Sequence, residues 1–547
     1  MKTNILTALF CFFLIGLSLQ VSAQSETTPV EIEVQESFAQ FLGKTPPLRN
    51  LVPRPHMDPE KRKLAKSKKK APQNFMGRGK RGPENPNALP KGDDSVWQKG
   101  FNKSQSFEVE PLVNVEGIYS NFGSPNDPSG DIGQDHYVQA VNATNIGVFD
   151  KEGNLLVEFT GNTLWNSINF SSAGDPIILY DQEVNRWIIT EFPSGNQLLV
   201  AISETSDPMG SWNAYNFGTP NFPDYPKYAI WGNTYVVTTN EEGPGSVPCY
   251  FIDRQALIEG VSNVPIQRIT LPGISGGPGF FAATPVDWTG LTPPLNGDRP
   301  MVMHLNDDAW SSSDQDRIDL YTFAIDWNNA NNTNAELTSI FTSPYDSNPC
   351  SVSGPGFSCV PQGGNGGGLD GLPEIIMNQT HYRNFGSHES MVLNFVTDVT
   401  GGDNLSGIRW VELRRSGGTW DVYQEGTFAP DDGLDRYMGA ICMDGNGNIG
   451  LAYNVSSENE FVGVRYTGRR ASDPLGQMTV DEYNAVSGTN TINSGARFGD
   501  YSHMSIDPTN DRTFWYTTEY AGGGNVRTRI VAFELGRDTI DIGPSAI

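Results

Sequence analysis

Charged and aromatic residues recur just ahead of several apolar, strand-like runs of this chain. Such groups stand at Asp135-His136-Tyr137, Asp175, Asp224 to Lys227, Arg436-Tyr437 and Arg497 to His503. If the strand after each group lies innermost around a shared axis, the groups converge at one end of that axis. Paired carboxylates serve as acid, base or nucleophile in glycoside cleavage, and arginine can hold an anion through two parallel hydrogen bonds.

Residue type assigns a role to each member of this set. Asp224 and Asp500 are the acid and base candidates, with Tyr501 and His503 as auxiliary groups. The ligand-binding candidates are Arg436 and Arg497 for an anion, and Asp175, Lys227, His136 and Tyr437. The alternative, which we favour from the sequence, is a structural ring of ion pairs that ties the strand starts together.

A second set of acidic residues raises the question of calcium. Asp444, Asn446 and Asn448 offer oxygens at alternating positions, and Asp307, Asp308, Asp314 and Asp316 form a cluster. Oxygen ligands of this kind suit Ca²⁺, although neither string is a complete EF-hand loop. The simpler interpretation of the recurring turn residues is that their carboxylates accept hydrogen bonds from turn amides. The residues concerned are Asp150, Asp181, Asp444 and Asp507.

Internal repetition predicts the fold. The stretch GDPIILYDQEVNRWIITEF, 174–192, has its best copy at 499–520, a looser one at 436–454 and a fourth at 136–159. The 59 Gly and 37 Pro among 547 residues favour an all-β chain with many turns. The repeats divide residues 107–535 into about seven units. Small antiparallel sheets bury both faces when they pack radially, so we predict a β-propeller with seven blades, six being the alternative.

The rest of the chain divides by composition. Residues 1–23 are predicted to be a signal peptide, and residues 24–103 a disordered basic leader. The propeller is predicted to span 104–536, and 537–547 to form a C-terminal linker stub. The leader is interpreted as a solvated linker, with a cleavable pro-region and a polyanion-binding arm as alternatives. The net charge of −26 argues against nucleic acid as a partner, and no stretch after the signal is apolar enough to span a membrane.

Cysteine usage agrees with export. Cys350 and Cys359 flank a Gly- and Ser-rich loop and are predicted to form a local disulfide. Cys249 and Cys442 lie within apolar runs, where a buried thiol is at least as plausible as a bridge.

Several strings together resemble a group of secreted bacterial propeller proteins. They include DHYVQAVN, TSDPMGSW, FPDYPK, RYMGAICMD and FGDYSHMSIDP. Many members of that group carry a C-terminal sorting domain for type IX secretion. The chain stops at GRDTIDIGPSAI without one, so surface attachment through a missing C-terminal domain is an expectation. A weaker resemblance is to sialidase-like propellers with an Asp-box hairpin.

These observations lead to three functional hypotheses. The first is an exported, extracellular or cell-surface binding module for a carbohydrate or protein ligand. The second is a glycan-degrading hydrolase or lyase that uses the carboxylates and arginines at the strand starts. The third is a structural adhesin or scaffold part. No cofactor is predicted apart from the calcium hypothesis.

Overall fold

The computed structural model describes residues 25–51, 85, 87–101, 107–119, 125–142, 145–241, 247–274, 282–295, 299–309, 315–350, 358–364, 366–402, 405–493 and 497–536. The predicted signal peptide and the C-terminal stub lie outside these residues. The described part is almost entirely β-structure, with short helices at α1 (Gly161–Asn166), α2 (Arg254–Glu259), η1 (Leu48–Asn50) and η3 (Ala330–Asn332). None of these helices is long and apolar enough to cross a membrane.

The strands group into four-stranded antiparallel units. Three units are separate sheets, and the other four are joined in pairs into a nine-stranded and a ten-stranded sheet. The first strands of successive units are β5 (Ser129–Ile132), β9 (Gly174–Asp181), β13 (Asp224–Trp231), β17 (Thr284–Trp288), β23 (Thr380–Asn384), β27 (Asp435–Met443) and β31 (His503–Ile506). Their neighbours are β6 (Tyr137–Val141), β10 (Arg186–Phe192), β14 (Thr234–Asn240), β18 (Met301–Asn306), β24 (Glu389–Asp398), β28 (Ile449–Ser456) and β32 (Phe514–Gly522).

The outer strands complete each unit. The third strands are β7 (Asn145–Phe149), β11 (Gln197–Ser203), β15 (Pro248–Asp253), β19 (Arg317–Ala324), β25 (Ser406–Arg415), β29 (Gly463–Arg469) and β33 (Asn525–Phe533). The fourth are β8 (Leu155–Thr160), β12 (Trp212–Gly218), β16 (Asn263–Thr270), β20 (Asn334–Phe341), β26 (Asp421–Phe428), β30 (Tyr483–Val486) and β4 (Val113–Glu116). A separate hairpin joins β21 (Ser358–Val360) and β22 (Leu369–Asp370).

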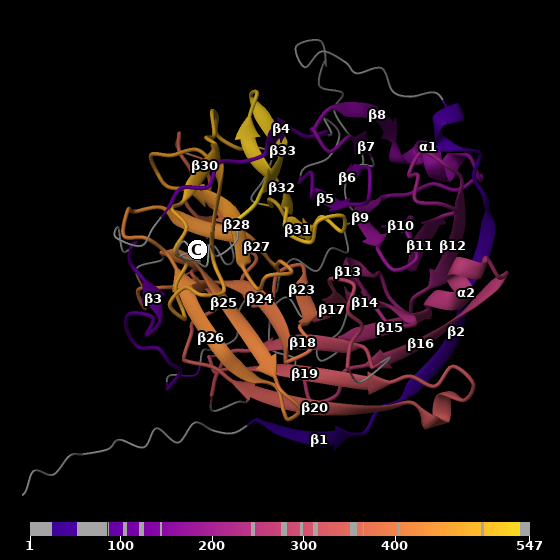
Figure 1. The fold of residues 1–547 in the computed structure, drawn as a ribbon, viewed down its shortest axis with the longest axis horizontal. Helices are drawn as coiled ribbons and strands as arrows, with labels where there is room; N and C mark the ends of the chain where they lie inside the picture. The colour runs from indigo at the N-terminus through magenta and orange to yellow at the C-terminus, as the bar shows by residue number, and fades with distance from the viewer. Residues whose placement is uncertain are drawn as a thin grey trace, which may run out of the picture.

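The first strands contact one another in a closed ring. Each touches the next in the order β5, β9, β13, β17, β23, β27 and β31, and β31 returns to β5. Their labels surround the middle of Figure 1. A closed ring of radial sheets is a β-propeller, as the sequence predicted. We number the units in this order, the first beginning with β5.

Closure of the ring uses both ends of the folded chain. The fourth strand of the last unit, β4, comes from the N-terminal side and pairs antiparallel with β33, so that Val113 faces Ala532. The closing strand therefore joins residues more than 400 positions apart.

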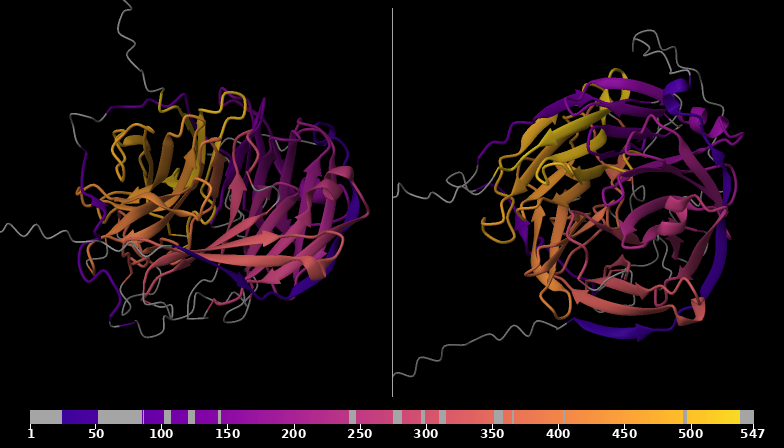
Figure 2. Two further views of the ribbon diagram at one scale, coloured as in Figure 1. Left: turned by 60° about the horizontal axis from the view of Figure 1, so that its bottom comes forward. Right: turned by 45° about the vertical axis from the view of Figure 1, so that its right-hand side comes forward.

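The leader contains strands, contrary to the prediction that it is disordered. Residues 24–103 were expected to be disordered, but β1 (Glu26–Val30) pairs with β20 and β3 (Trp97–Gln98) pairs with β26. Between them, β2 (Val34–Lys44) pairs with both β12 and β16, so one strand bridges the outer edges of the second and third units. These indigo strands wrap the outside of the ring (Figure 2). The expectation failed because the basic run at 61–80 dominated the composition, while edge strands of the blades offered unpaired backbone groups.

Buried tryptophans pack against aromatic rings both within a unit and between units. Trp187 lies 4.7 Å from the Tyr180 ring, and Trp515 lies 5.1 Å from the Tyr137 ring, as centroid distances. The predicted disulfide between Cys350 and Cys359 is also present, with the Cα atoms 5.4 Å apart. Cys249 and Cys442 are buried and unbridged.

The bridging strand gives the first testable prediction. Ala39 is 1% exposed in the central core, whereas the adjacent Phe38 is 56% exposed on the other face of β2. We expect Ala39→Glu to lower the free energy of unfolding by at least about 2 kcal/mol, because it buries an unpaired charge. Urea unfolding measures this, and Phe38→Glu is the control, expected to change stability by about 0.5 kcal/mol or less. Equal losses from the two variants would contradict the packing of β2.

Candidate functional site at one mouth of the channel

Four successive units bring acidic residues together at one end of the ring of first strands. Asp127 precedes β5, Asp175 and Asp224 lie at the starts of β9 and β13, and Asp500 precedes β31. With Arg497 and Tyr501 they form what we call the mouth cluster. The structure therefore brings together Asp175, Asp224, Arg497, Asp500 and Tyr501 of the residues singled out in the sequence; Asp127 was not among them.

Direct contacts join the members of the mouth cluster. The Tyr501 hydroxyl donates to Asp175 Oδ2 at 2.8 Å, and the Asp500 amide donates to Asp127 Oδ1 at 3.2 Å. Arg497 forms an ion pair with Asp500 Oδ2. Asp500 Oδ1 is buried and has no hydrogen-bond partner within the described residues. These contacts make the cluster a packed assembly of charges.

The backbone at the strand starts explains how these side chains reach the channel. Asp175 and Tyr225 have φ of 50°, and Met438, at the start of β27, has φ of 51°. Each value lies in the left-handed region that residues other than glycine rarely adopt. The pairing register shifts beside each of them, and such bulges re-aim side chains. Sequence reasoning gave no sign of these bulges.

Exposure differs sharply within the mouth cluster. Asp500 and Asp127 are each 1% exposed and Asp175 is 8% exposed. The Arg497 side chain is 39% exposed, and Asp224 is partly exposed. A ligand that approaches the mouth therefore meets Arg497 and Asp224 first.

Burial shifts the proton affinities of the carboxyl groups. Desolvation, with repulsion from Asp175 and Asp500, raises the pKa of Asp224 to about 7 against the attraction of Arg497. Desolvation raises the pKa of Asp175 to about 6, although Arg497 and the Tyr501 hydroxyl oppose it. Burial and the surrounding carboxylates hold the pKa of Asp127 well above its usual range. Ionisable groups with perturbed pKa values cluster at functional sites.

Glu519, which was also not among the residues predicted from the sequence, accepts hydrogen bonds from backbone amides at the mouth cluster. Its Oε1 accepts from the Asp127 amide at 2.9 Å and from the Gly499 amide at 3.0 Å. Burial raises the pKa of Glu519 to about 7. The residue lies within β32, and its sequence surroundings, TTEY, read as an ordinary strand.

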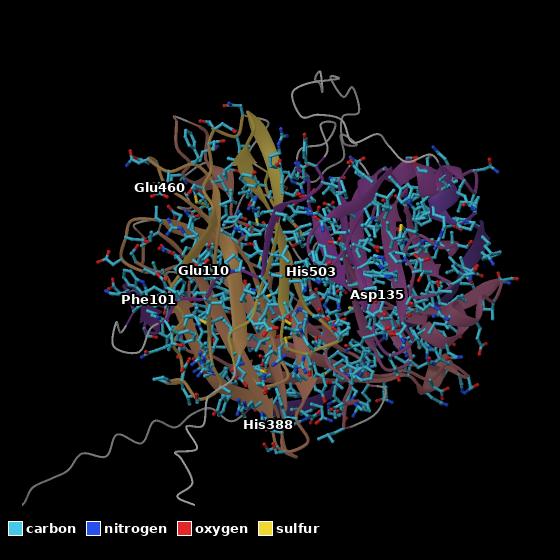
Figure 3. All side chains as sticks on the ribbon, turned by 45° about the horizontal axis from the view of Figure 1, so that its top comes forward. Phe101, Glu110, Asp135, His388, Glu460 and His503 are labelled. Carbon is cyan, nitrogen blue, oxygen red and sulfur yellow. A yellow bond between two sulfur atoms is a disulfide. The ribbon has the colours of Figure 1, made fainter. Side chains whose placement is uncertain are left out.

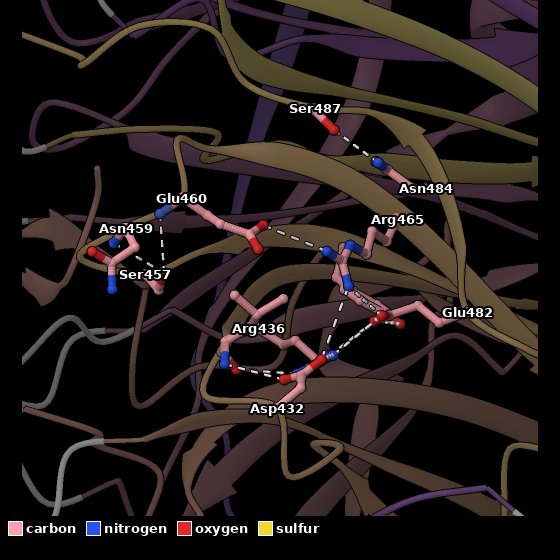
Figure 4. Close-up of polar contacts among 11 residues, drawn as sticks. Asp432, Arg436, Ser457, Asn459, Glu460, Arg465, Glu482, Asn484 and Ser487 are labelled. Carbon is pink, nitrogen blue, oxygen red and sulfur yellow. Dashed lines mark hydrogen bonds and ion pairs between the residues drawn. The ribbon is translucent and has the colours of Figure 1, made fainter. Parts of the chain in front are cut away.

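Two predicted ligand-binding residues of the sixth unit do not join the mouth cluster. Arg436 is fully buried and pairs with Asp432 at 2.7 Å and Glu482 at 2.9 Å, beside Arg465 (Figure 4). Since strand side chains alternate between faces, Arg436 points away from the core that holds Tyr437. Tyr437 is buried, and its hydroxyl contacts Ser456 Oγ at 3.0 Å. The prediction that Arg436 holds an external anion is wrong, because carboxylates already occupy its guanidinium.

Lys227, His503 and His136 also lie elsewhere. Lys227 is fully buried below the mouth and donates to the Ile376 carbonyl at 2.6 Å, and burial holds its pKa well below the usual range. His503 lies inside the molecule (Figure 3), 3.1 Å from Gln379 Oε1, with a pKa that burial lowers to about 4. His136 follows the end of β5 and so lies at the opposite end of the channel from Asp127. None of the three belongs to the mouth cluster.

The turn at Asp444 fits the structural alternative. Asp444 Oδ1 accepts from the amides of Asn446 at 2.8 Å and Asn448 at 2.9 Å, and its Oδ2 accepts from the Asn448 side chain at 2.8 Å. These bonds use the oxygens that calcium would need. The calcium hypothesis for Asp444, Asn446 and Asn448 is therefore not supported by their geometry. Asp150 and Asp507 cap their turns in the same way. Asp181 does not, because its carboxylate accepts from the Arg254 guanidinium and the Tyr235 hydroxyl.

The other acidic cluster does converge. Asp307, Asp308 and Asp316 are buried and present ligand atoms within 4.8 Å of one another; Asp314 lies outside the described residues. Burial raises the pKa of Asp316 to about 7, and burial with repulsion from Asp346 and Asp316 raises that of Asp307 well above its usual range. Asp307 and Asp316 nevertheless accept several backbone amides, from Ala309, Ser347, Asp308 and Tyr345.

No family model and no curated protein matches this chain. Among solved structures, it is similar to a protein of unknown function from Dyadobacter fermentans, with TM-score 0.34, 9% identity and coverage of 78% of this chain and 99% of that one. An ulvan lyase matches with TM-score 0.37 and 10% identity over 78% and 96%. The WD40 domain of SCAP from fission yeast matches with TM-score 0.34 and 11% identity over 79% and 98%. Likeness at these scores does not establish a shared activity.

The raised pKa values of the mouth cluster predict a pH dependence of stability. Between about pH 4 and pH 7 the folded chain binds more protons at Asp175 and Asp224 than the unfolded chain, in which both have ordinary values near 3.8. The contribution of these groups to stability therefore falls as pH rises through this window. We expect Asp224→Asn to make that fall shallower and to stabilise the protein at pH 8 relative to the parent.

Urea unfolding at several pH values measures this slope. Asp135→Asn is the control, since Asp135 is exposed at the other end of the channel. If stability fell with pH as steeply in Asp224→Asn as in the parent, the raised pKa of Asp224 would not be a cause of that fall.

The calcium hypothesis at Asp307, Asp308 and Asp316 has its own test. An ion held there would stabilise the folded chain, by about 2.7 kcal/mol at a hundred times its dissociation constant. After treatment with EDTA, added CaCl₂ should then raise the Tm of the parent but not that of Asp316→Asn, in differential scanning calorimetry. A Tm unaffected by CaCl₂ in the parent would rule out calcium at this cluster.

Proposed function

We propose that the chain is an exported, carbohydrate-related β-propeller that acts as an extracellular binding module, with the mouth cluster as its ligand site. One observation carries this proposal: most carboxylates of the mouth cluster are buried and already paired, while Arg497 and Asp224 reach the surface. An acid and base pair of a glycosidase must flank a sugar about 5 to 10 Å apart. Carboxylates packed against Tyr501 and Arg497 fit recognition better than such cleavage.

The two exposed members suit a hydroxyl-rich ligand. Arg497 donates through a planar fork that can engage two acceptors at once, and Asp224 either accepts or, when protonated, donates a hydrogen bond. Export rests on the sequence of residues 1–23 and on the disulfide of Cys350 and Cys359, a bond typical of oxidising compartments. Type IX sorting and surface attachment are further proposals, carried only by the resemblance in sequence.

The second candidate is a glycan-degrading hydrolase or lyase. The observation that favours it is the pKa of Asp224, about 7, on a partly exposed carboxyl group. Such a group still carries its proton at neutral pH and can act as a general acid. In this case Asp175 or Asp500 would be the second carboxyl group, and Asp224 would donate the proton to the leaving oxygen.

A glycan array on the protein from residue 24 onward tests both candidates. The leader must be retained because β1, β2 and β3 belong to the fold. For a glycan that binds, we expect Arg497→Gln to weaken affinity at least tenfold, about 1.4 kcal/mol. Arg497→Lys keeps a cation beside Asp500 and therefore controls for loss of binding through unfolding. It should weaken binding less than Arg497→Gln. Arg512→Gln, in the turn at the opposite end of the channel, is the control.

Product analysis on each glycan that binds separates the candidates. Binding without new products supports the module, whereas products that disappear in Asp224→Asn support the enzyme. Binding that survives unchanged in both Arg497 variants would move the ligand away from the mouth cluster. A folded protein that binds no glycan on the array would instead favour the scaffold hypothesis.

A further inference from the structure

An open groove of about 360 Å³ lies on the outer part of the sixth unit. The turn between β28 and β29 contributes Asn459 and Glu460 to its lining, and the end of β30 and the residues after it contribute Asn484 and Ser487. Arg465 of β29, the strand between them, completes this set of polar residues. Figure 4 shows these five side chains.

The groove lies at the same end of the ring as the mouth cluster but is a different site. Ser456, the last residue of β28, pairs with Asp435 at the start of β27, so the turn that follows it lies at the mouth end. Arg465 is on the third strand of the unit and Asn484 on the fourth. Neighbouring strands are about 4.8 Å apart, which places the groove about 10 to 14 Å outward from β27. The mouth cluster belongs to the first, second, third and seventh units.

The polar groups of the groove are accessible to a ligand. The Glu460 side chain is 52% exposed and that of Arg465 is 18% exposed. Asn459, Asn484 and Ser487 are also exposed. Glu460 Oε2 and Arg465 Nη2 are 3.5 Å apart, whereas a full charge-assisted hydrogen bond measures about 2.7 to 2.9 Å. The carboxylate and this edge of the guanidinium therefore keep bonding capacity for a third group.

Contacts below the groove hold Arg465 in place. Its Nη1 donates to Glu482 at 2.6 Å, and Glu482 also accepts from the Tyr453 hydroxyl at 2.7 Å and from Arg436 Nε at 2.9 Å. Arg465 faces Asn484 across the strands, beside a shift in the pairing register, and such bulges re-aim side chains. The Nη2 edge of Arg465 is thus positioned before a ligand arrives, which reduces the entropy lost on binding.

The charge balance of this network selects against an anionic ligand. The carboxylates of Asp432, Glu460 and Glu482 outnumber the guanidinium groups of Arg436 and Arg465 by three to two. A further anion would be repelled, and a cation would meet the two arginines. A ligand hydroxyl can accept from Arg465 and donate to Glu460 at the same time, whereas a carbonyl oxygen only accepts. The groove therefore suits a neutral ligand that is rich in hydroxyl groups.

We propose that this groove binds a neutral oligosaccharide, with one sugar hydroxyl held between Arg465 and Glu460 and its neighbours on the asparagine amides. The volume lies within the range of about 300 to 1,000 Å³ that small-ligand sites occupy. The partly buried ring of Phe461 also lines the groove and offers an aromatic surface to the apolar face of a sugar. This site goes beyond the proposed function, which concerns the mouth cluster alone.

Isothermal titration calorimetry on the protein from residue 24 onward tests the site. The probes are cellotetraose, xylotetraose, mannotetraose, laminaritetraose and maltotetraose, with tetragalacturonate as an anionic comparator. At least one neutral tetrasaccharide should bind saturably, and tetragalacturonate should bind at least tenfold more weakly than the best of them. Binding of none of the neutral probes, or tighter binding of tetragalacturonate, would overturn the proposal.

Substitutions in the groove locate the binding. Glu460→Ala removes the acceptor from an exposed turn. Arg465→Lys keeps a positive charge for Glu482 but cannot also donate into the groove, because an ammonium group lacks the planar fork of a guanidinium. Each should weaken the best neutral sugar at least fivefold. Glu458→Ala removes an exposed carboxylate of the same turn that does not line the groove, and this matched control should leave affinity unchanged.

The outcomes separate this groove from the mouth cluster. If Arg465→Lys does not fold, Asn484→Ala replaces it, since Asn484 is exposed and should tolerate substitution. Affinity that the groove variants leave intact but that falls in Arg497→Gln would assign the sugar to the mouth cluster; this result would overturn the groove site and support the proposed function. A crystal structure with the best sugar should place a hydroxyl within hydrogen-bond distance of Arg465 Nη2 and Glu460. A sugar bound elsewhere, or affinity unaffected by every groove variant, would overturn the assignment.

Discussion

The structure depends on the closure of the ring by β4. Val113 to Glu116 pair with Ala532 to Arg529, and Gly117 N donates to the Thr528 carbonyl at 3.0 Å just beyond the strand. Each four-stranded sheet has two faces to bury, and only a closed ring buries both faces of every sheet. The seventh unit lacks its fourth strand until this pairing forms, so the packing of the whole ring depends on a contact between distant parts of the chain.

Closure also assembles the mouth cluster. The amide of Asp500 meets Asp127 across 373 residues of sequence, and the Tyr501 hydroxyl meets Asp175 across 326. The first and last units become neighbours only when the ring is complete. The concentration of carboxyl groups at this mouth is therefore a property of the closed fold. It is maintained against repulsion by Arg497, by the Tyr501 hydroxyl and by partial protonation of the acids themselves.

The leader acts on the outside of the ring. By pairing with β12 and β16, β2 turns two separate blade edges into one continuous sheet, and β1 extends the fourth unit. The N-terminal segment thus covers exposed edges, which are otherwise liable to pair with other chains.

The sequence by itself determined the all-β repeat architecture, the disulfide and the capped turns, because these depend on local pattern: alternation, glycine and proline punctuation, and aspartates that accept nearby amides. It also placed Asp175, Asp224, Asp500 and Arg497 at strand starts, where a ring brings them together. Only the tertiary structure decided that Arg436 pairs inward with Glu482 and that Glu519 supports the mouth. It alone showed that residues 26–30 and 34–44 are strands. Those outcomes depend on strand pairing, bulges and contacts across the ring, which no local pattern specifies.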